Sequence, residues 1–361
     1  MSSVEKNKKI LILCPYPFGT APGQRFRYEQ YLESLTQHNF NYSIHSFWDD
    51  QTYLVLYKRK YFLKKIYGLV KGFVKRILLL FRLSNHEFVF IFRELTPIGP
   101  PVFEWIIAKI FKKKIIYDFD DAIWLPNTSE HNRIASFVKW HQKVKWICRW
   151  AYKVSAGNRY LCAYASHYNS KVILNPTTID TINLHNRVKD QNTKRIIIGW
   201  TGTHSTIKYL QDIVPIIAEL EKKYAFEFQV IADKNPLLPL QSFVFKPWNK
   251  QTEIDDLLEF NIGIMPLVDD PWAKGKCGFK ALQYMALGIP PLVSPVGVNS
   301  EIVQHKHNGF ICASSSEWIE CLSELIIDIN SRIVMGKKAR QTVVENYSVQ
   351  SNTMNFLNLF Q

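Results

Sequence analysis

The chain has 361 residues, of which 47% are hydrophobic and 14% aromatic, so it can bury the cores of two domains and is not a disordered protein. Its 45 lysines and arginines against 31 aspartates and glutamates give a formal net charge of +14, which indicates an anionic partner. Nucleic acid, anionic lipid and a phosphorylated substrate all fit that charge. The positions of the basic residues along the chain help to separate these classes.

The N-terminal region and the cysteines indicate a cytoplasmic protein. The apolar run in "KKILILC" is too short for the core of a signal peptide or for a membrane span. The six cysteines, at positions 14, 148, 162, 277, 312 and 321, form no CxxC pair and no close cluster, which is typical of reduced thiols. We therefore expect a protein that does not cross a bilayer.

Strands and helices alternate through the first half of the chain. Continuous apolar runs are typical of strands buried on both faces, and a helix-like pattern follows each. The expected strands lie within 9–17, 88–94, 113–124, 153–157 and 170–180, with helices around 26–35, 101–111 and 158–165. This alternation predicts βαβ units and a parallel sheet.

One segment supplies much of the positive charge. Residues 58–82, "KRKYFLKKIYGLVKGFVKRILLLFR", hold nine basic residues and no acidic one. At about 100° per residue they predict an amphipathic helix. Its apolar stripe comprises Phe62, Ile66, Leu69, Phe73, Ile77 and Leu80, and its basic side comprises Lys60, Lys64, Lys71, Lys75 and Arg82. Such a helix can lie on an anionic membrane; the alternatives are a surface helix packed on its own domain, or nucleic-acid binding, which no accompanying motif supports.

A polar, unpatterned stretch at 183–194 is the expected linker, and the alternation restarts after it. Strands are expected within 195–200, 226–233 and 262–267, a long loop over 233–250, and helices over 207–224, 253–260, 316–329 and 331–346. Two similar α/β halves would place a ligand cleft at the carboxyl ends of their sheets.

The loop "GWTGTHST" (199–206) follows the first strand of the second half. Its glycines permit close approach of the backbone to a ligand, and free N–H groups at the next helix favour an anion such as a diphosphate. The loop matches neither the GxGxxG nor the Walker pattern. The alternative interpretation is that Ser205 or Thr206 is simply a helix N-cap.

Two stretches of the first half carry charge where predicted strands end. "DFDDAIW" (118–124) holds three carboxylates, which can bind sugar hydroxyls, act as a base or hold a metal. The simpler interpretation is a helix N-cap with surface charge. Arg25 and Arg27 follow the first strand, where guanidinium groups suit a phosphate or a carboxylate. They are otherwise ordinary surface cations.

The stretch "GKCGFKALQYMALGIPPLVSPVG" (275–297) joins a basic turn to an apolar helix and a strand. Cys277 as a nucleophile would need a basic partner that no local signature supplies, so a buried packing role is the better interpretation. Lys276 and Lys280 lie near the start of the predicted helix, where cations oppose the helix dipole. We therefore expect an anionic group to offset them.

On these residues the second half resembles the retaining glycosyltransferases of the GT-B fold, specifically glycosyltransferase family 4 (glycosyl transferases group 1). The matching stretches are "IIIGWTGTHSTIKYL", "FNIGIMPLVDDPWAKGKCGFKALQYMALGIPPLVSPVGVNSEIV" and "NGFIC", which cover most of 195–346. The first half fits more loosely, through "YDFDDAIW", "SAGNRYL" and "ILNPTTID".

The resemblance implies an α/β protein with two Rossmann-like domains whose parallel sheets face a central cleft. An acceptor-side domain would occupy 1–185 and a nucleotide-sugar-binding domain 186–346. A final helix over 347–361 would pack back toward the first domain.

The resemblance also implies the donor. It would be a UDP- or GDP-sugar, bound without any required metal or other cofactor. The family's donor motif has two glutamates separated by seven residues, and these positions hold Gly275 and Gln283 here. Gln283 can still hydrogen-bond a ribose hydroxyl through its amide. Gly275 has no side chain to offer, a loss for which Asp269, Asp270 or Lys276 can compensate.

The implied reaction retains the configuration of the transferred sugar. Negative charge builds on the leaving diphosphate, where cations and helix N-termini stabilise it. Lys276 is a candidate catalytic residue, together with Asp120 and Asp121, which would face the acceptor or the sugar. The candidate donor-binding residues are Arg25, Gly202, Thr203, His204, Ser205, Gly278, Phe279, Lys280 and Gln283.

We therefore expect a cytoplasmic glycosyltransferase that is peripheral on the inner face of the cell membrane through residues 58–82. Its acceptor would be a glycan or a lipid-linked glycan in cell-surface polysaccharide synthesis, and it would bind no nucleic acid. Two alternatives are a non-catalytic membrane-surface protein on the same scaffold and a nucleotide-sugar epimerase, which would need no acceptor.

Overall fold

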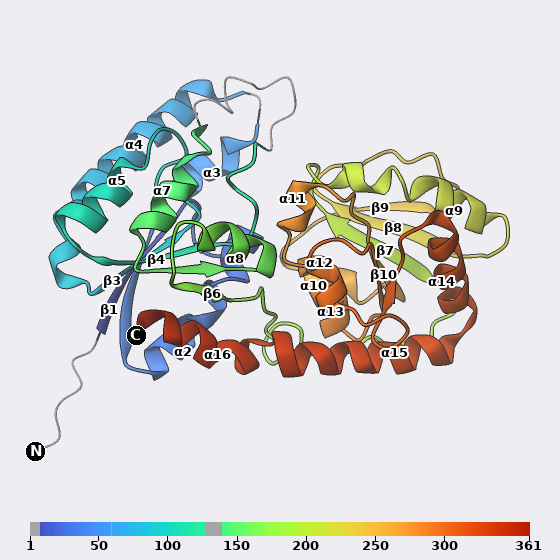
Figure 1. Ribbon diagram of the computed structural model, residues 1–361. Coiled ribbons are helices and arrows are strands. Elements are labelled where there is room, and N and C mark those ends of the chain that lie inside the picture. The colour runs from blue at the N-terminus through green and yellow to red at the C-terminus, as the bar shows by residue number, and fades with distance from the viewer. Residues whose placement is uncertain (1–7, 59, 127–138) are drawn as a thin grey trace, which may run out of the picture. The chain divides into compact units, whose positions relative to one another are not determined.

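The computed structural model describes residues 8–58, 60–126 and 139–361, and the chain divides into two α/β units (Figure 1). The first unit comprises Met1–Thr177 with Thr353–Gln361, and the second comprises Thr178–Asn352. Each unit holds a six-stranded sheet in which all neighbouring strands are parallel. The α/β class predicted from the sequence is confirmed, and the division between the units lies several residues ahead of the expected 185/186 boundary.

The first sheet has the strand order β2-β1-β3-β4-β5-β6. Its central strands are apolar because helices cover both faces, and all five residues of β3 are buried. The strands are β1 (Lys8–Cys14), β2 (Phe40–Ser46), β3 (Phe88–Phe92), β4 (Lys114–Phe119), β5 (Lys153–Ala156) and β6 (Val172–Leu174).

The helices of the first unit form a layer on each side of this sheet. Figure 1 shows α4, α5 and α7 on one side and α2 and α16 on the other. Phe356 and Phe360 of the C-terminal segment pack on Phe90 with ring centroids 6.1 and 6.2 Å away. The helical segments are α1 (Pro22–Arg25), η1 (Glu29–Tyr31), α2 (Leu32–Gln37), α3 (Asp50–Leu56), α4 (Phe62–Leu80), η2 (Leu83–Asn85), α5 (Val102–Trp105), η3 (Ile106–Ile110), α7 (Lys143–Trp150), α8 (Arg159–Ser166), α16 (Val349–Leu357) and η7 (Asn358–Phe360).

The second sheet has the order β12-β11-β10-β7-β8-β9, so the chain reverses direction across the sheet between β7 and β10. Such a switch point is where open α/β sheets bind ligands, beyond the carboxyl ends of the strands. The strands are β7 (Ile197–Gly202), β8 (Glu227–Ala232), β9 (Phe243–Pro247), β10 (Ile262–Met265), β11 (Pro291–Val293) and β12 (Phe310–Ile311).

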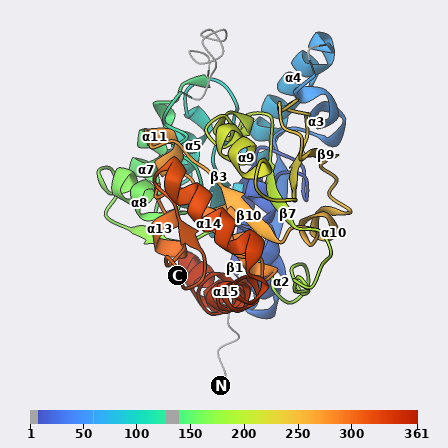
Figure 2. The same cartoon turned by 90° about the vertical axis from the view of Figure 1, so that its right-hand side faces the viewer.

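Helices α9 and α14 lie side by side on the second sheet (Figure 2), and their apolar residues join one core cluster with those of the strands. The helical segments of this unit are η5 (Ile207–Leu210), α9 (Val214–Glu221), α10 (Glu253–Leu257), α11 (Pro271–Lys274), α12 (Phe279–Ala286), α13 (Asn299–Ile302), α14 (Ser315–Ile327), α15 (Ile329–Thr342) and η6 (Val343–Tyr347).

Two parts of the second unit differ from expectation. The helix expected over 207–224 is divided into η5 and α9, and Pro215 stands in the first turn of α9, where its missing N–H costs nothing. Residues 183–194, the expected linker, pack against the rest of the second unit. Gln191 is buried and exchanges hydrogen bonds with Asn261, from its Nε2 to the backbone oxygen and from Asn261 Nδ2 to its Oε1, both at 3.1 Å.

Within the part of the chain that the structure describes, no helix combines the length and the apolar character needed to span a bilayer.

Candidate functional site

The strongest candidate site of the second unit lies at the carboxyl end of β7. Gly202 closes this strand, and a β-carbon there would stand 2.3 Å from the Trp200 ring and 2.7 Å from Thr206 Oγ1. Only glycine therefore permits the chain to turn so closely past the indole. Lys280, in the first turn of α12, holds its Nζ 5.4 Å from the centroid of the same ring. Trp200 thus brings together Gly202 and Lys280, two predicted donor-site residues 78 positions apart in sequence.

The start of α12 is shaped by a second glycine. Gly278 precedes the helix with φ +69°, and a β-carbon there would lie 2.2 Å from Ile302 Cδ1. Both facts require glycine. Phe279 and Lys276 on either side are half-buried, and Lys276 Nζ lies 5.9 Å from the Trp272 ring centroid.

The thiol of Cys277 is enclosed by the protein. The residue is 8% exposed, and its Sγ lies 3.9 Å from the backbone oxygen of Gly275. This burial agrees with the predicted packing role.

The loop after β7 is closed by hydrogen bonds within the protein. The amide of Thr203 donates to Thr206 Oγ1 at 3.1 Å, and the amide of Thr206 donates back to the Thr203 backbone oxygen at 2.8 Å. The hydroxyls of Thr203 and Ser205 bond to each other at 2.8 Å. The amides of Thr203 and Thr206, two of those expected to meet an anion, therefore have acceptors within the protein.

His204 is held by an aspartate that sequence reasoning missed. Asp233 follows β8, and its carboxylate accepts from the His204 backbone amide and faces His204 Nδ1, both at 2.6 Å. The second contact leaves Nε2 as the ring nitrogen that points away from the carboxylate. A signal was present in the sequence, since "FEFQVIAD" ends a predicted strand in an acidic residue at the ligand-binding edge of the sheet.

Gln283 presents an unsatisfied amide. It is 2% exposed, and its Nε2 has no hydrogen-bond partner among the described residues. Asn299, at the start of α13, is 1% exposed; its Nδ2 donates to the Ser294 backbone oxygen at 3.1 Å, but its Oδ1 is likewise without a partner there. Buried polar groups without partners are uncommon and cost about 1–3 kcal/mol each, so they mark places where a ligand or water completes the bonding.

An open hollow lies at the end of β9, in the long loop where no strand was predicted. Its lining includes Trp248, Asn249, Lys250 and Thr252. The Trp248 amide donates to the Ala232 backbone oxygen at 2.9 Å, immediately before Asp233, so the hollow adjoins the His204 contact. An aromatic ring beside amide and ammonium groups suits a flat, polar ligand.

In the first unit, Asp120 and Asp121 pair with Arg93. Arg93 Nη2 lies 2.6 Å from an oxygen of each carboxylate, and its Nε donates to Asp120 Oδ1 at 2.8 Å. Burial by itself lowers the pKa of Arg93, but the two carboxylates outweigh it and raise the pKa above the ordinary value. Arg93, which has φ +61°, follows β3 and was not predicted as a site residue.

Neither aspartate is assembled into a metal site. Across residues 8–58, 60–126 and 139–361, no three His, Cys, Asp or Glu side chains gather as a metal ion would require. Three positions after Asp121, Trp124 stacks on Tyr164 with ring centroids 3.7 Å apart.

The two arginines after β1 have different surroundings. Arg27 is 2% exposed, and its Nη2 pairs with Asp118 Oδ1 at 2.5 Å while Ser155 Oγ donates to the same oxygen. Arg27 also donates to the Asn175 backbone oxygen, so it joins the ends of three strands and is not a surface cation. Arg25 is half-buried with its Cζ 5.1 Å from the Phe26 ring centroid.

Solved structures share this fold over nearly the whole chain. Sucrose-phosphate synthase from Thermosynechococcus elongatus superposes with a TM-score of 0.70 at 12% identity, with 98% of each chain covered. A glycosyltransferase from Rickettsia africae ESF-5 gives 0.68 at 12% identity, over 99% of this chain and 98% of that one. Anabaena Alr3699/HepE in complex with UDP gives 0.63 at 13% identity, over 98% and 99%. The chain therefore has the GT-B fold of glycosyltransferases.

The sequence match lies in the second unit. Residues 195–328 match the family model described as "Glycosyl transferases group 1", which confirms the resemblance to that group predicted from the sequence. A search of curated proteins by sequence finds no match. The family match and the GT-B fold together support glycosyl transfer as the general activity.

Proposed function

We propose that the protein is a retaining glycosyltransferase that moves a sugar from a UDP- or GDP-sugar to a glycan or lipid-linked acceptor. The proposal rests on the buried side-chain amide of Gln283, whose Nε2 has no hydrogen-bond partner among the described residues. Gln283 lies on α12, and Lys280 in the first turn of that helix contacts the Trp200 ring. Gly202 packs against the same ring. A ribose hydroxyl can accept from this amide and remove the cost of its burial.

The donor would lie along the carboxyl edge of the second sheet. Its nucleoside enters the hollow beside Trp248, where the base can stack on the indole. Its diphosphate lies toward the loop after β7, within reach of the Thr203 and Ser205 hydroxyls and of the His204 ring. Lys280 and the start of α12, with Gly278 and Phe279, face the same charge. Arg25 of the first unit is a further candidate for it.

The reaction needs stabilisation of the charge that develops on the leaving diphosphate. Lys276 and Lys280 supply it as positive side chains, an effect worth about 3–4 kcal/mol when one such group is removed from an active site. Asp120 and Asp121 act on the acceptor or the sugar, with Arg93 fixing both carboxylates. Because the lysines provide the positive charge, the proposal requires no metal ion.

The acceptor side belongs to the first unit in this proposal. Asp120 and Asp121 would bind sugar hydroxyls, and Trp124, three positions after Asp121, stacks on Tyr164. Aromatic groups close to polar ones suit a carbohydrate. The basic segment 58–82 favours a position at the inner face of the cell membrane, where lipid-linked precursors of cell-surface polysaccharides are accessible.

Calorimetric titration of the purified protein with a panel of UDP-, GDP- and ADP-sugars tests the proposal, combined with an assay of donor hydrolysis. We expect binding of at least one donor and slow hydrolysis of it. K276A should abolish turnover, whereas K222A, a matched change of an exposed lysine directly after α9, should not. Absence of nucleotide binding across the whole panel would refute the proposal that the protein is an enzyme. Conversion of the free donor to an epimer would show an epimerase in place of a glycosyltransferase.

A further inference from the structure

Helix α4 rests on the first unit with an unusual inner side. Its buried residues are Gly68, Gly72, Arg76 and Leu79, of which only one is a large apolar residue. A β-carbon at Gly68 would meet the Thr52 side chain at 2.3 Å, and one at Gly72 would meet the Phe47 ring at 2.5 Å. These two glycines therefore allow the backbone of α4 to pack closely against the first unit.

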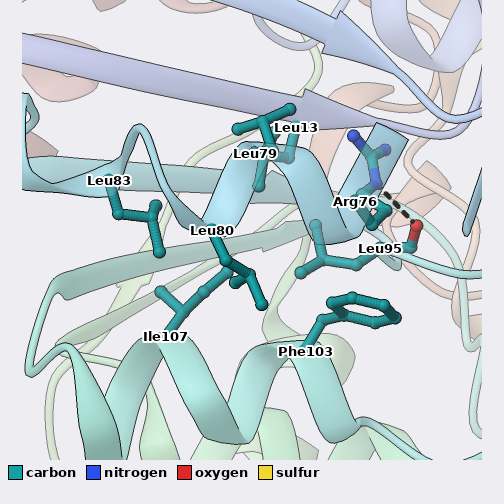
Figure 3. A pocket seen from close by; sticks show the side chains of 8 residues that line it. All are labelled: Leu13, Arg76, Leu79, Leu80, Leu83, Leu95, Phe103 and Ile107. Carbon is teal, nitrogen blue, oxygen red and sulfur yellow. Dashed lines mark hydrogen bonds between the residues drawn. The ribbon is translucent and has the colours of Figure 1, made fainter. Parts of the chain in front are cut away.

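Arg76 fixes how α4 is turned about its own axis. Its guanidinium donates to the backbone oxygens of Cys14, His45 and Leu95 at 2.9, 3.0 and 3.0 Å, which binds the helix to the ends of two strands and to the loop after β3. Figure 3 shows the bond to Leu95, with the leucines of α4 and η2 facing Phe103 and Ile107 across a small apolar pocket.

The opposite side of α4 is apolar and exposed. At about 100° per residue, the residues centred opposite Gly68 and Gly72 form a continuous stripe. We call it the outer face; its members and their exposed fractions are Leu63 81%, Tyr67 67%, Val70 55%, Val74 48%, Ile77 49%, Leu78 58% and Phe81 79%. A surface helix of a globular protein normally carries polar residues on this side.

The outer face differs from the apolar stripe predicted from the sequence. Phe73 of that stripe packs against the rings of Phe47 and Phe103, at 5.5 and 6.2 Å between centroids, and Leu80 lines the pocket of Figure 3. Three of its six members, Leu69, Phe73 and Leu80, are half-buried. The predicted stripe therefore lies partly in contact with the domain, because α4 is turned so that its glycines and Arg76 face inward.

The neighbouring helical segment extends the apolar surface. Helix α5 and η3 pack against α4 through the Phe73–Phe103 contact and the shared pocket. They expose Val102, Trp105, Ile110 and Phe111 to solvent, at 50, 43, 59 and 39%. Lys109 and Lys112 are exposed among them. Two adjoining segments thus present large apolar residues together with lysines.

The charge beside the outer face is positive. Lys64 and Lys71 are exposed on one flank, and α4 contains no acidic residue. Lys71 Nζ pairs with Asp49 at 2.6 Å, and the adjacent α3 also carries Asp50, so part of this charge is balanced. The remaining flank complements an anionic surface, while a second copy of the chain would bring its own lysines against it.

We propose that the outer face of α4, with the exposed residues of α5 and η3, lies in the headgroup region of an anionic bilayer. Apolar side chains of this kind enter the boundary between headgroups and acyl chains, lysines reach the phosphates, and an interfacial tryptophan such as Trp105 prefers that depth. The inference deepens the proposed function by assigning the surface that meets the membrane, and it rests on that function only for a membrane-bound acceptor.

Co-sedimentation with vesicles tests this surface. The full chain is mixed with vesicles of phosphatidylcholine alone, or of equal parts phosphatidylcholine and phosphatidylglycerol. We expect binding to the anionic vesicles only, weakened by salt. The triple variant L63S/V74S/F81S should lose binding by about tenfold or more. The matched control L237S/I327S/V334S removes three exposed apolar residues of the second unit and should bind as the parent does.

Three results would overturn the inference: unchanged binding by the α4 variant, equal binding to neutral vesicles, or loss of binding by the control. Sedimentation velocity provides a fourth, since a dimer abolished by the α4 variant would make the outer face a contact between copies. Circular dichroism and UDP titration of each variant verify folding. If the protein binds nucleotide but no vesicles, only this inference is contradicted. If it binds vesicles but no nucleotide, only the proposed function is contradicted.

Discussion

Polar side chains near the carboxyl edges of the two sheets differ in how their hydrogen bonds are satisfied. In the first unit, Arg27, Arg76 and Arg93 each reach carboxylates or backbone oxygens of the same unit. In the second unit, the buried amide of Gln283 has no partner among the described residues. Polar groups that complete one another stabilise a fold, whereas a buried donor without an acceptor is a cost that a ligand can remove. In the proposed function, the donor supplies the acceptor that the Gln283 amide lacks within the described part of the chain.

The largest expected effect is a loss of stability from a substitution at the carboxyl edge of the first sheet. D118A leaves the Arg27 guanidinium buried without its carboxylate, and breaking a buried pair in this way costs about 3–5 kcal/mol. Urea unfolding followed by circular dichroism should show the first unit unfolding at markedly lower denaturant. E219A, which removes an exposed pair with Lys222, should change stability by less than about 1 kcal/mol. A D118A protein as stable as the parent would mean that Arg27 needs no partner.

Substitutions at the carboxyl edge of the second sheet should change activity more than stability. K280A removes a cation proposed to face the diphosphate and should lower kcat/KM by about 10²–10³-fold. Stability should fall by no more than about 1 kcal/mol, through loss of the contact with Trp200. Steady-state transfer assays at saturating acceptor measure the first quantity and thermal unfolding the second. K222A serves as the control. A variant that loses stability in proportion to activity would make Lys280 a structural residue.

A third substitution sharpens the contrast, because stability and binding should move in opposite directions. Q283M replaces the unsatisfied amide with an apolar side chain of similar length, so the second unit should be equally stable or more stable by about 1 kcal/mol. Donor affinity should fall by about tenfold, since a lost hydrogen bond of 1–1.5 kcal/mol corresponds to that factor. Calorimetry and urea unfolding measure the two. Loss of stability without loss of affinity would contradict the assignment.

The smallest effect is a dependence on pH. Burial, followed by the charge of Arg76 and Arg82, lowers the pKa of His45 below its unfolded value of about 6.5. Below that pH the unfolded chain binds more protons than the folded one, so this histidine withdraws stability as pH falls. H45Q should therefore lose less stability than the parent between about pH 7.5 and about pH 5. Thermal unfolding at both pH values measures it, with H307Q, an exposed change, as control; equal losses in all three proteins would exclude His45.

The sequence predicted the central strands well, and it missed the edge strands β2 and β9, although the edge strand β6 lies within the predicted 170–180. Strands β1, β3, β4, β7, β8 and β10 are buried on both faces and appear as continuous apolar runs. Strands β2 and β9 lie at sheet edges, and most of their residues are half-buried or exposed. Their sequences therefore lack the run that marks a buried strand, and neither was predicted.

The site residues divide in a similar way. Gly202 and Lys280 could be proposed as candidates because a glycine loop after a strand and a cation at the start of a helix are local patterns. Arg93 and Asp233 could not be ranked in advance, because their importance comes from partners 28 and 29 positions away. The orientation of α4 was also beyond reach, since periodicity shows that a helix has apolar residues but not that Gly68 and Gly72 are the ones turned inward.

The two glycines of α4 have a practical consequence. Since the helix is seated by backbone contact and by Arg76, the leucines, valines and phenylalanine of its outer face contribute little to holding it in place. Those positions can be rewritten with polar residues independently of the core. A surface that hampers purification or crystallisation of the chain could thus be redesigned one residue at a time, with the cores of the two α/β units left intact.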